Sequence, residues 1–180
     1  MQRSFLMYIP ALVLMAAANL NVCCDISVNG SELSGSYSPA CANECMRVSA
    51  LAAEEICVGR AEMPELKMHT HLTLIPPENN RQEFTDSVLR ETEGITLLKS
   101  VFVKGKRLGS VSAECDIREL LRQNIVSQQP NSAVYGIYSG EIIIEQCYGR
   151  TSSEADSSDM VLLVSGMAPV MYYDSGGERA

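Results

Sequence analysis

The sequence predicts an α+β protein with about three helices and an antiparallel sheet, in a three-layer-like arrangement stabilised by disulfides. Residues 95–103 are rich in aliphatic and β-branched side chains, which favour a strand, and residues 113–127 place apolar side chains at helical spacing. Residues 134–138 and 141–148 flank Ser139-Gly140, a link that suits a tight hairpin turn. A strand, a helix and a hairpin in succession are typical of an α+β protein.

The N-terminus has the pattern of a signal peptide. Arg3 precedes an unbroken apolar run from Phe5 to Ala18, which ends in three alanines suited to cleavage. The run is short for a membrane helix, which needs about 20 apolar residues. A retained anchor and a buried N-terminal helix are the alternatives. We therefore expect a secreted, extracellular protein, or one held at the cell surface through a partner, with no transmembrane span after cleavage. The predicted parts are a signal peptide (1–18), an irregular lead-in (19–39), a single α+β domain (40–173) and a flexible tail (174–180).

Further elements follow from local patterns. A first helix is predicted from Pro39 or Ala40 to Val58, where a glycine follows, and a strand over 67–75, which Pro76-Pro77 ends. Asn79 or Asn80 can cap a second helix that reaches about Glu93. Near the C-terminus we expect a polar loop over residues 151–159, followed by two short strands over residues 160–164 and 170–173.

The central helix has two contrasting sides. Ser112 is the expected cap, and one stripe carries apolar side chains: Ile117, Leu120, Leu121 and Ile125. The opposite side carries Arg118, Glu119, Arg122 and Gln123.

Seven cysteines behind a signal peptide indicate an oxidising compartment and disulfides. An odd number leaves at least one cysteine unpaired or bridged to another chain, and spacing does not fix the pairing. Cys23 or Cys24 is the candidate for the leftover thiol, and a disulfide-linked dimer is one consequence. Cys57 or Cys115 is the candidate partner of Cys147. The full set of disulfide candidates is Cys23, Cys24, Cys41, Cys45, Cys57, Cys115 and Cys147.

Charge argues against nucleic acid as a partner. The net charge of −8 repels phosphate backbones. Four cations close together in the sequence are the local exception and form a candidate polyanion contact, with a solvated turn as the alternative: Lys99, Lys104, Lys106 and Arg107. Asn29 begins an Asn-Gly-Ser sequon and is the candidate glycosylation site.

His69 and His71 are the two histidines and the candidate ligands of a metal. Two residues apart on a strand, they point to the same face, and with Cys41 and Cys45 they would make a zinc set. The cysteines are expected in disulfides, so we expect no metal and no cofactor. His71 also begins an H-x-T-x sequence, but phosphoesterases of that type need two such motifs. No serine-hydrolase elbow, P-loop or G-x-G-x-x-G occurs.

A series of short segments occurs in an order known from one family. The segments are Cys41-Ala42-Asn43-Glu44, Ala113-Glu114-Cys115-Asp116, Gln129-Pro130, Val134-Tyr135-Gly136-Ile137-Tyr138 and Cys147. This order resembles the secreted and surface-anchored SAG antigens of coccidian parasites, of the Eimeria type. Residues 160–169 resemble their final apolar strand. This chain lacks the tryptophan, the last-strand cysteine and the hydrophobic GPI tail that those antigens commonly carry. The resemblance implies a CAP-like α-β-α sandwich without a working active site, and a role at the parasite–host boundary.

These observations lead to one main functional hypothesis and two alternatives. The main one is a secreted or cell-surface binding or antigen-like protein without catalytic activity, whose partner is an extracellular protein or a host-surface ligand. The alternatives are a small secreted hydrolase or effector that uses His69 or His71, and a subunit of a disulfide-linked extracellular complex.

Overall fold

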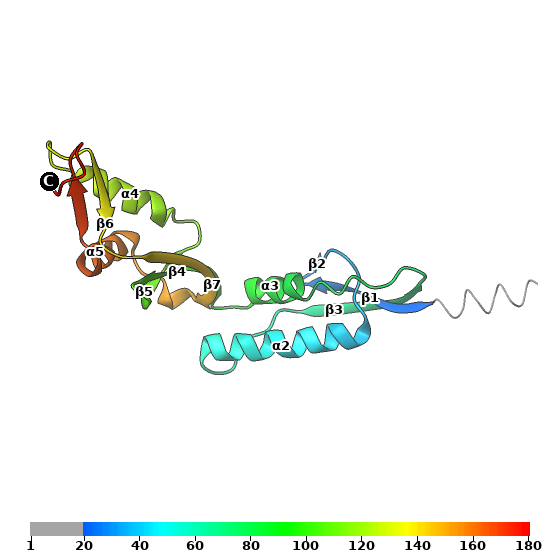
Figure 1. Ribbon diagram of the computed structural model, residues 1–180. Helices are drawn as coiled ribbons and strands as arrows, with labels where there is room; N and C mark the ends of the chain where they lie inside the picture. The colour runs from blue at the N-terminus through cyan, green and yellow to red at the C-terminus, as the bar shows by residue number, and fades with distance from the viewer. Residues whose placement is uncertain (1–19) are drawn as a thin grey trace, which may run out of the picture. The chain divides into compact units, whose positions relative to one another are not determined.

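The computed structural model describes residues 20–180, which form two compact units divided between Glu93 and Gly94. Both units combine helices with antiparallel strands, so the predicted α+β class is confirmed (Figure 1). The described part of the first unit contains β1 (Asn21–Val28), β2 (Ser31–Glu32), α2 (Pro39–Cys57), β3 (Leu66–Thr73) and α3 (Arg81–Glu91). The second contains β4 (Ile95–Val103), β5 (Lys106–Ser112), α4 (Ile117–Ser127), β6 (Tyr135–Tyr138), β7 (Ile142–Arg150), the 3-10 turn η1 (Thr151–Ser153), α5 (Ser157–Met167) and β8 (Val170–Tyr173).

The first unit packs two helices on an antiparallel sheet of order β2-β1-β3. Alternate residues of β1 enter its core because successive strand side chains point to opposite faces. The core joins these residues to side chains of α2 and α3: Cys24, Ile26, Val28, Tyr37, Cys41, Ala42, Cys45, Phe84 and Val88.

Side-chain caps define the helix starts in this unit. The Ser38 hydroxyl accepts a hydrogen bond from the Cys41 backbone N–H at 3.2 Å, and Pro39 occupies the first turn. The Asn80 side chain accepts one from the Glu83 N–H at 3.2 Å. Both helices therefore lie where the sequence predicts them, within about two residues.

Tyr37 makes the stability of this unit sensitive to alkaline pH. Its ring is fully buried, and burial, with the nearby Glu83 carboxylate, raises its pKa from 10.0 to about 12. Between these pH values the unfolded chain releases the phenolic proton while the folded chain keeps it, so stability falls as pH rises. We expect Tyr37→Phe to reduce this loss in denaturant titrations at pH 10 and 12. An unchanged pH dependence would contradict the assignment.

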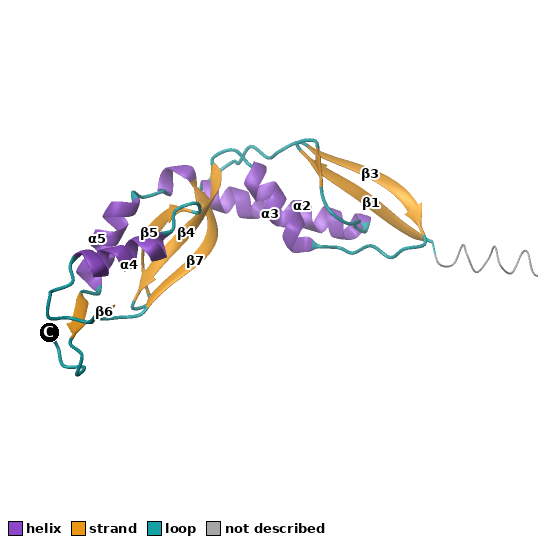
Figure 2. Cartoon of the chain, turned by 90° about the horizontal axis from the view of Figure 1, so that it is seen from above, coloured by secondary structure: helices purple, strands orange, loops and turns teal. Residues whose placement is uncertain are grey.

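The second unit places α4 and α5 over one face of a sheet of order β5-β4-β7 (Figure 2). Val101 and Val103 of β4 pack with Ile117 and Leu121 of α4, and all four are buried. The rest of this buried core comes from β5 and from α5 with the residue after it: Val111, Met160, Val164 and Ala168.

The predicted hairpin of residues 134–138 and 141–148 is wrong. β7 pairs with β4, placing Ile144 opposite Val101, whereas β6 pairs with β8, placing Tyr135 opposite Tyr173. The alternating isoleucines of β7 continue the apolar face of β4, and this long-range match prevails over the local turn signal. A hairpin does form earlier, at Lys104-Gly105, where both residues have positive φ.

The strand predicted over residues 160–164 is also wrong, because these residues lie within α5. The Asp156 carboxylate caps α5 by accepting hydrogen bonds from the N–H groups of Ser158 and Asp159. Met160 and Val164 are buried one turn apart. A short apolar run does not distinguish a strand from a buried helix face. For the central helix, Asp116 is the cap in place of Ser112.

Both ends of the described chain are more ordered than the sequence suggests. The expected irregular lead-in contains β1, which pairs with β3 from Asn21 opposite Thr73 to Val28 opposite Leu66. In the expected flexible tail, the Ala180 N–H donates to the Tyr172 carbonyl at 2.9 Å. The predicted single domain over 40–173 differs from the observed division at Glu93 and Gly94. The predicted signal peptide, residues 1–18, lies outside the described residues.

Candidate ligand-binding groove

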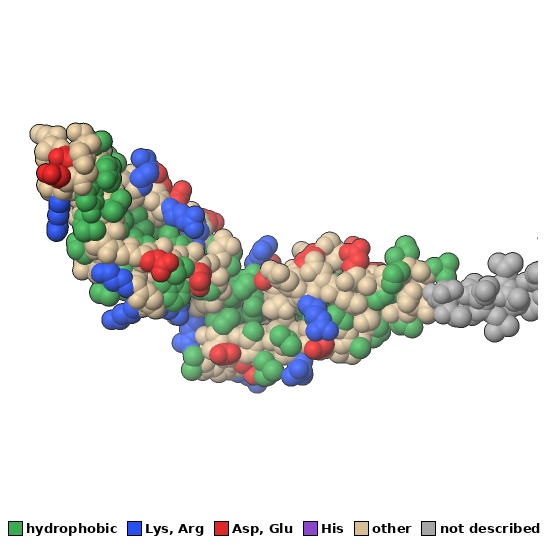
Figure 3. Space-filling model, in the orientation of Figure 1, with side chains coloured by type: hydrophobic (Ala, Val, Ile, Leu, Met, Phe, Trp, Pro, Cys, Tyr) green, Lys and Arg blue, Asp and Glu red, His purple; other side chains and the backbone are tan. Residues whose placement is uncertain are grey.

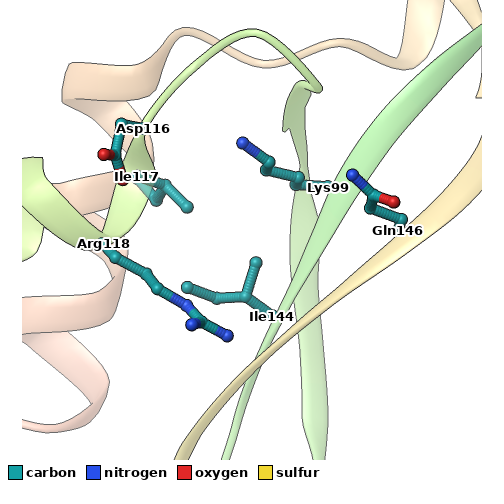
Figure 4. A pocket seen from close by; sticks show the side chains of 6 residues that line it. All are labelled: Lys99, Asp116, Ile117, Arg118, Ile144 and Gln146. Atoms are coloured by element: carbon teal, nitrogen blue, oxygen red, sulfur yellow. The ribbon is translucent and has the colours of Figure 1, made fainter.

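Two adjoining hollows lie between α4 and the sheet of the second unit. Their volumes are about 300 and 340 Å³, and because they share Arg118 and Ile144 they form one groove. The first is lined by Lys99, Asp116, Ile117, Arg118, Ile144 and Gln146, and the second by Arg118, Leu121, Arg122, Ile125, Tyr138, Ile142 and Ile144. Figure 4 shows Lys99 and Gln146 projecting from the strands and Arg118 from α4, with Ile117 and Ile144 between them.

The position of α4 follows from its amphipathic sequence. Ile117 and Leu121, one turn apart, are buried in the core, with 1% and 6% of their surface exposed. Arg118 directly follows Ile117, and Arg122 directly follows Leu121. The two arginines therefore lie at the margin of the buried stripe and not on the far side of the helix. The Asp116 carboxylate accepts the Glu119 N–H at 3.2 Å and is occupied in capping α4.

The floor of the groove is apolar. Lys99, Val101 and Val103 of β4 are opposite Gln146, Ile144 and Ile142 of β7, so these residues share the sheet face that α4 covers. Tyr138 lies at the far end, where its hydroxyl donates to the Leu121 carbonyl at 3.2 Å and accepts from the Asn124 amide at 3.1 Å. This hydroxyl is therefore already satisfied by α4.

The charges of the groove are positive on balance, with three cations and one carboxylate among the lining residues. The Lys99 ammonium donates to the Cys115 carbonyl at 2.7 Å. Arg122 binds both oxygens of Glu119, at 2.7 and 2.6 Å, and these hydrogen bonds lower the pKa of Glu119 to about 2. Among the salt bridges formed within residues 20–180, none involves Arg118. Arg118 is thus the groove cation available to an anionic ligand.

Figure 3 shows cationic side chains, in blue, beside hydrophobic ones, in green, over α4. This juxtaposition agrees with the residues that line the groove. A surface that offers both a cation and apolar side chains is suited to an amphipathic anion.

The predicted polyanion contact is not assembled as a group around this groove. Lys99 lines it, but Lys104 donates to the Met167 carbonyl at 3.1 Å and Arg107 donates to the Ser110 hydroxyl at 2.9 Å. Lys106 begins β5 opposite Val103. Of the four predicted cations, Lys99 alone lines the groove, where it is joined by Arg118 from the polar side of the central helix.

Disulfide stabilisation is not supported by the structure, since it contains no disulfide among the seven cysteines of residues 20–180. The sulfurs of Cys41 and Cys45 are 3.9 Å apart. One turn of helix holds Cβ atoms about 5–6 Å apart, whereas a disulfide needs about 3.5–4.5 Å, so these two cannot bridge without distorting α2. Cys23 and Cys24 are both buried, with their side chains on opposite faces of β1.

The predicted partnership of Cys57 or Cys115 with Cys147 is likewise absent from the structure. The Cys147 sulfur lies 3.0 Å from the Ser100 hydroxyl, which in turn is 2.9 Å from the Ser110 hydroxyl. Cys115 packs instead against the core beneath α4 and α5. The thiol of Cys147 therefore belongs to a small polar cluster on the sheet face opposite α4.

The histidines lie in the first unit. His71 pairs through its Nδ1 with the Asp25 carboxylate at 3.2 Å, and its side chain is about one-third exposed. His71 and His69 line two hollows that share Asp25 and Glu32. No group of three or more metal-ligating side chains occurs within residues 20–180. Zinc ligation by Cys41, Cys45, His69 and His71 thus has no assembled site in this part of the chain.

Asn29 lies in the tight turn between β1 and β2 with a positive φ of 49°. Its amide nitrogen donates to Glu91 at 3.0 Å, and its side-chain oxygen accepts the Glu65 N–H at 2.9 Å. The residue is exposed, but its side chain takes part in holding the turn. Glycosylation at Asn29 stays a prediction.

Comparisons with known proteins give no relative for this chain: no family model, curated protein or solved structure matches it. The resemblance to the coccidian SAG antigens therefore stays a prediction. Within residues 20–180, no helix is long and apolar enough to cross a membrane.

Proposed function

We propose that this protein is a secreted or cell-surface binding protein, and that the groove between α4 and the β5-β4-β7 sheet is its ligand site. The observation that carries the proposal is Arg118, a cation without a salt bridge that stands over the apolar floor of the groove. The apolar N-terminal run supports secretion. The ligand that this chemistry fits has an apolar part and an anionic group.

Burial and charge explain why such a site has affinity. Apolar ligand surface that contacts Ile142 and Ile144 is removed from water, and this burial contributes about 25 cal/mol of binding free energy per Å². A hydrogen bond to a charged group adds about 1.5–3 kcal/mol. The planar guanidinium of Arg118 presents parallel N–H donors to an anion.

The fluorescent anion anilinonaphthalene sulfonate tests the proposal because it joins an apolar ring system to a sulfonate. We expect saturable binding to the full chain recovered from a secreting eukaryotic host. Arg118→Glu replaces attraction of the sulfonate by repulsion. We therefore expect it to raise the Kd about tenfold or more, equivalent to about 1.4 kcal/mol. The measurement is a fluorescence titration.

Arg90→Glu is the matched control. Arg90 is exposed near the end of α3, in the other unit, and the substitution changes the net charge by the same amount. We expect it to leave the Kd within about twofold of the original, because Arg90 lines neither hollow of the groove. Equal effects of the two substitutions would refute the groove as the site.

A further inference from the structure

We infer that the ligand of the groove is a medium-chain fatty acid, whose carboxylate head meets Arg118 and whose chain lies along α4 toward Ile125. This inference rests on the proposed function and names the chemical class of its ligand.

The head of the ligand is defined by the cations at one end of the groove. Arg118 has a planar fork of donors that matches the two oxygens of a carboxylate. Lys99 lines the same hollow, and its ammonium keeps two donors after the hydrogen bond to Cys115. The Asp116 carboxylate caps α4 and points away from Lys99 in Figure 4, so the space beside Lys99 is left for an external anion.

The tail of the ligand is defined by what lines the other hollow. Apart from Arg118 and Arg122, its side chains are apolar or have their polar atom satisfied: Leu121, Ile125, Tyr138, Ile142 and Ile144. Arg122 is held by Glu119. From Arg118 to Ile125 the helix rises about 10 Å, so an extended acyl chain can lie parallel to α4 over this distance.

The charge of the whole chain favours a ligand with one negative charge. The protein carries −8, so a polyanion is repelled as it approaches, while the local excess of cations in the groove is small. Each of the two hollows, of about 300 and 340 Å³, lies near the lower end of the range of about 300–1,000 Å³ found for small-molecule sites. A single acyl chain with one carboxylate meets both conditions.

Isothermal titration of the secreted full chain with laurate, dodecanol and acetate tests the inference. Laurate has both head and tail, dodecanol has the tail alone, and acetate has the head alone. We expect saturable binding of laurate, and Kd values for dodecanol and acetate that are each at least about tenfold weaker.

Arg118→Ala separates the two parts of the ligand. Arg118 is exposed, so its removal leaves the core intact, which a thermal melt checks. We expect laurate binding to weaken about tenfold while dodecanol binding does not change, and Arg90→Ala to alter neither. Equal binding of laurate and dodecanol, or laurate binding that does not depend on Arg118, would overturn the inference.

A second titration, with hexaglutamate, distinguishes failure of this inference from failure of the proposed function. If laurate does not bind but hexaglutamate does, and Arg118→Ala abolishes that binding, the groove is a site for acidic peptides and the fatty-acid inference is wrong. If laurate, hexaglutamate and the sulfonate probe all prove insensitive to Arg118, both the inference and the proposed function are wrong.

Discussion

Phe84→Ala is expected to lower the free energy of unfolding of the first unit by about 3–5 kcal/mol. The Phe84 ring is fully buried between α2, α3 and β1, and its centroid lies 5.6 Å from that of Tyr37, edge to face. The substitution removes both the buried area and this aromatic contact, which is worth about 0.5–1.5 kcal/mol beyond the area. It also leaves a cavity that the tightly packed neighbours cannot fill.

Urea denaturation followed by far-ultraviolet circular dichroism measures the effect. Phe102→Ala is the matched control because the Phe102 ring is only partly buried, in β4 of the other unit. We expect the control to cost clearly less, since less apolar surface returns to water. A loss for Phe84→Ala no larger than that of the control would contradict the packing described for the first core.

The elements that the sequence predicts well are those with local causes. Ser38 caps α2 and Asn80 caps α3, because each side chain accepts a backbone N–H of the first turn, and of these two caps the sequence predicts Asn80. β4 is predicted within its observed bounds because its β-branched composition belongs to the strand itself. Caps and composition need no knowledge of the rest of the fold.

The errors concern partners that are distant in sequence. Only three residues separate β6 from β7, yet β7 pairs with β4, and β6 pairs with β8. The disulfide prediction also depends on residues that are distant in sequence. The number of cysteines and the inferred compartment do not show which two sulfur atoms lie within bonding distance. β1 was missed since a strand that pairs with β3, some 45 residues away, gives little local signal in a serine-rich stretch.

The groove illustrates the same limit at the level of function. From the sequence, Arg118 is placed on the side of the helix opposite the apolar stripe of Ile117 and Leu121. It becomes a groove residue only when β7 brings Ile144 beside α4, which the mistaken hairpin did not predict. The available signal was the alternation of Ile142 and Ile144, whose apolar face needs a helix to cover it.

Val101→Asp is expected to destabilise the second unit by at least about 3 kcal/mol and to abolish ligand binding with it. Val101 is fully buried at the centre of the β5-β4-β7 sheet, facing α4 and α5. An ionised carboxylate there would have no partner, and an uncompensated buried charge costs about 3–5 kcal/mol. The groove is formed by that same sheet face and α4, so it cannot persist when their packing is lost.

Ile143→Asp is the control that separates burial from charge in this sheet. Ile143 lies on the neighbouring strand, points to the opposite face and is 37% exposed, so its carboxylate can stay in water. The measurements are the urea midpoint and titration with the sulfonate probe. We expect the Ile143→Asp variant to stay folded and to bind the probe, and the Val101→Asp variant to lose both stability and binding. If Val101→Asp kept its midpoint and its affinity, α4 and α5 would not cover this face, and a groove built on that packing would have to be abandoned.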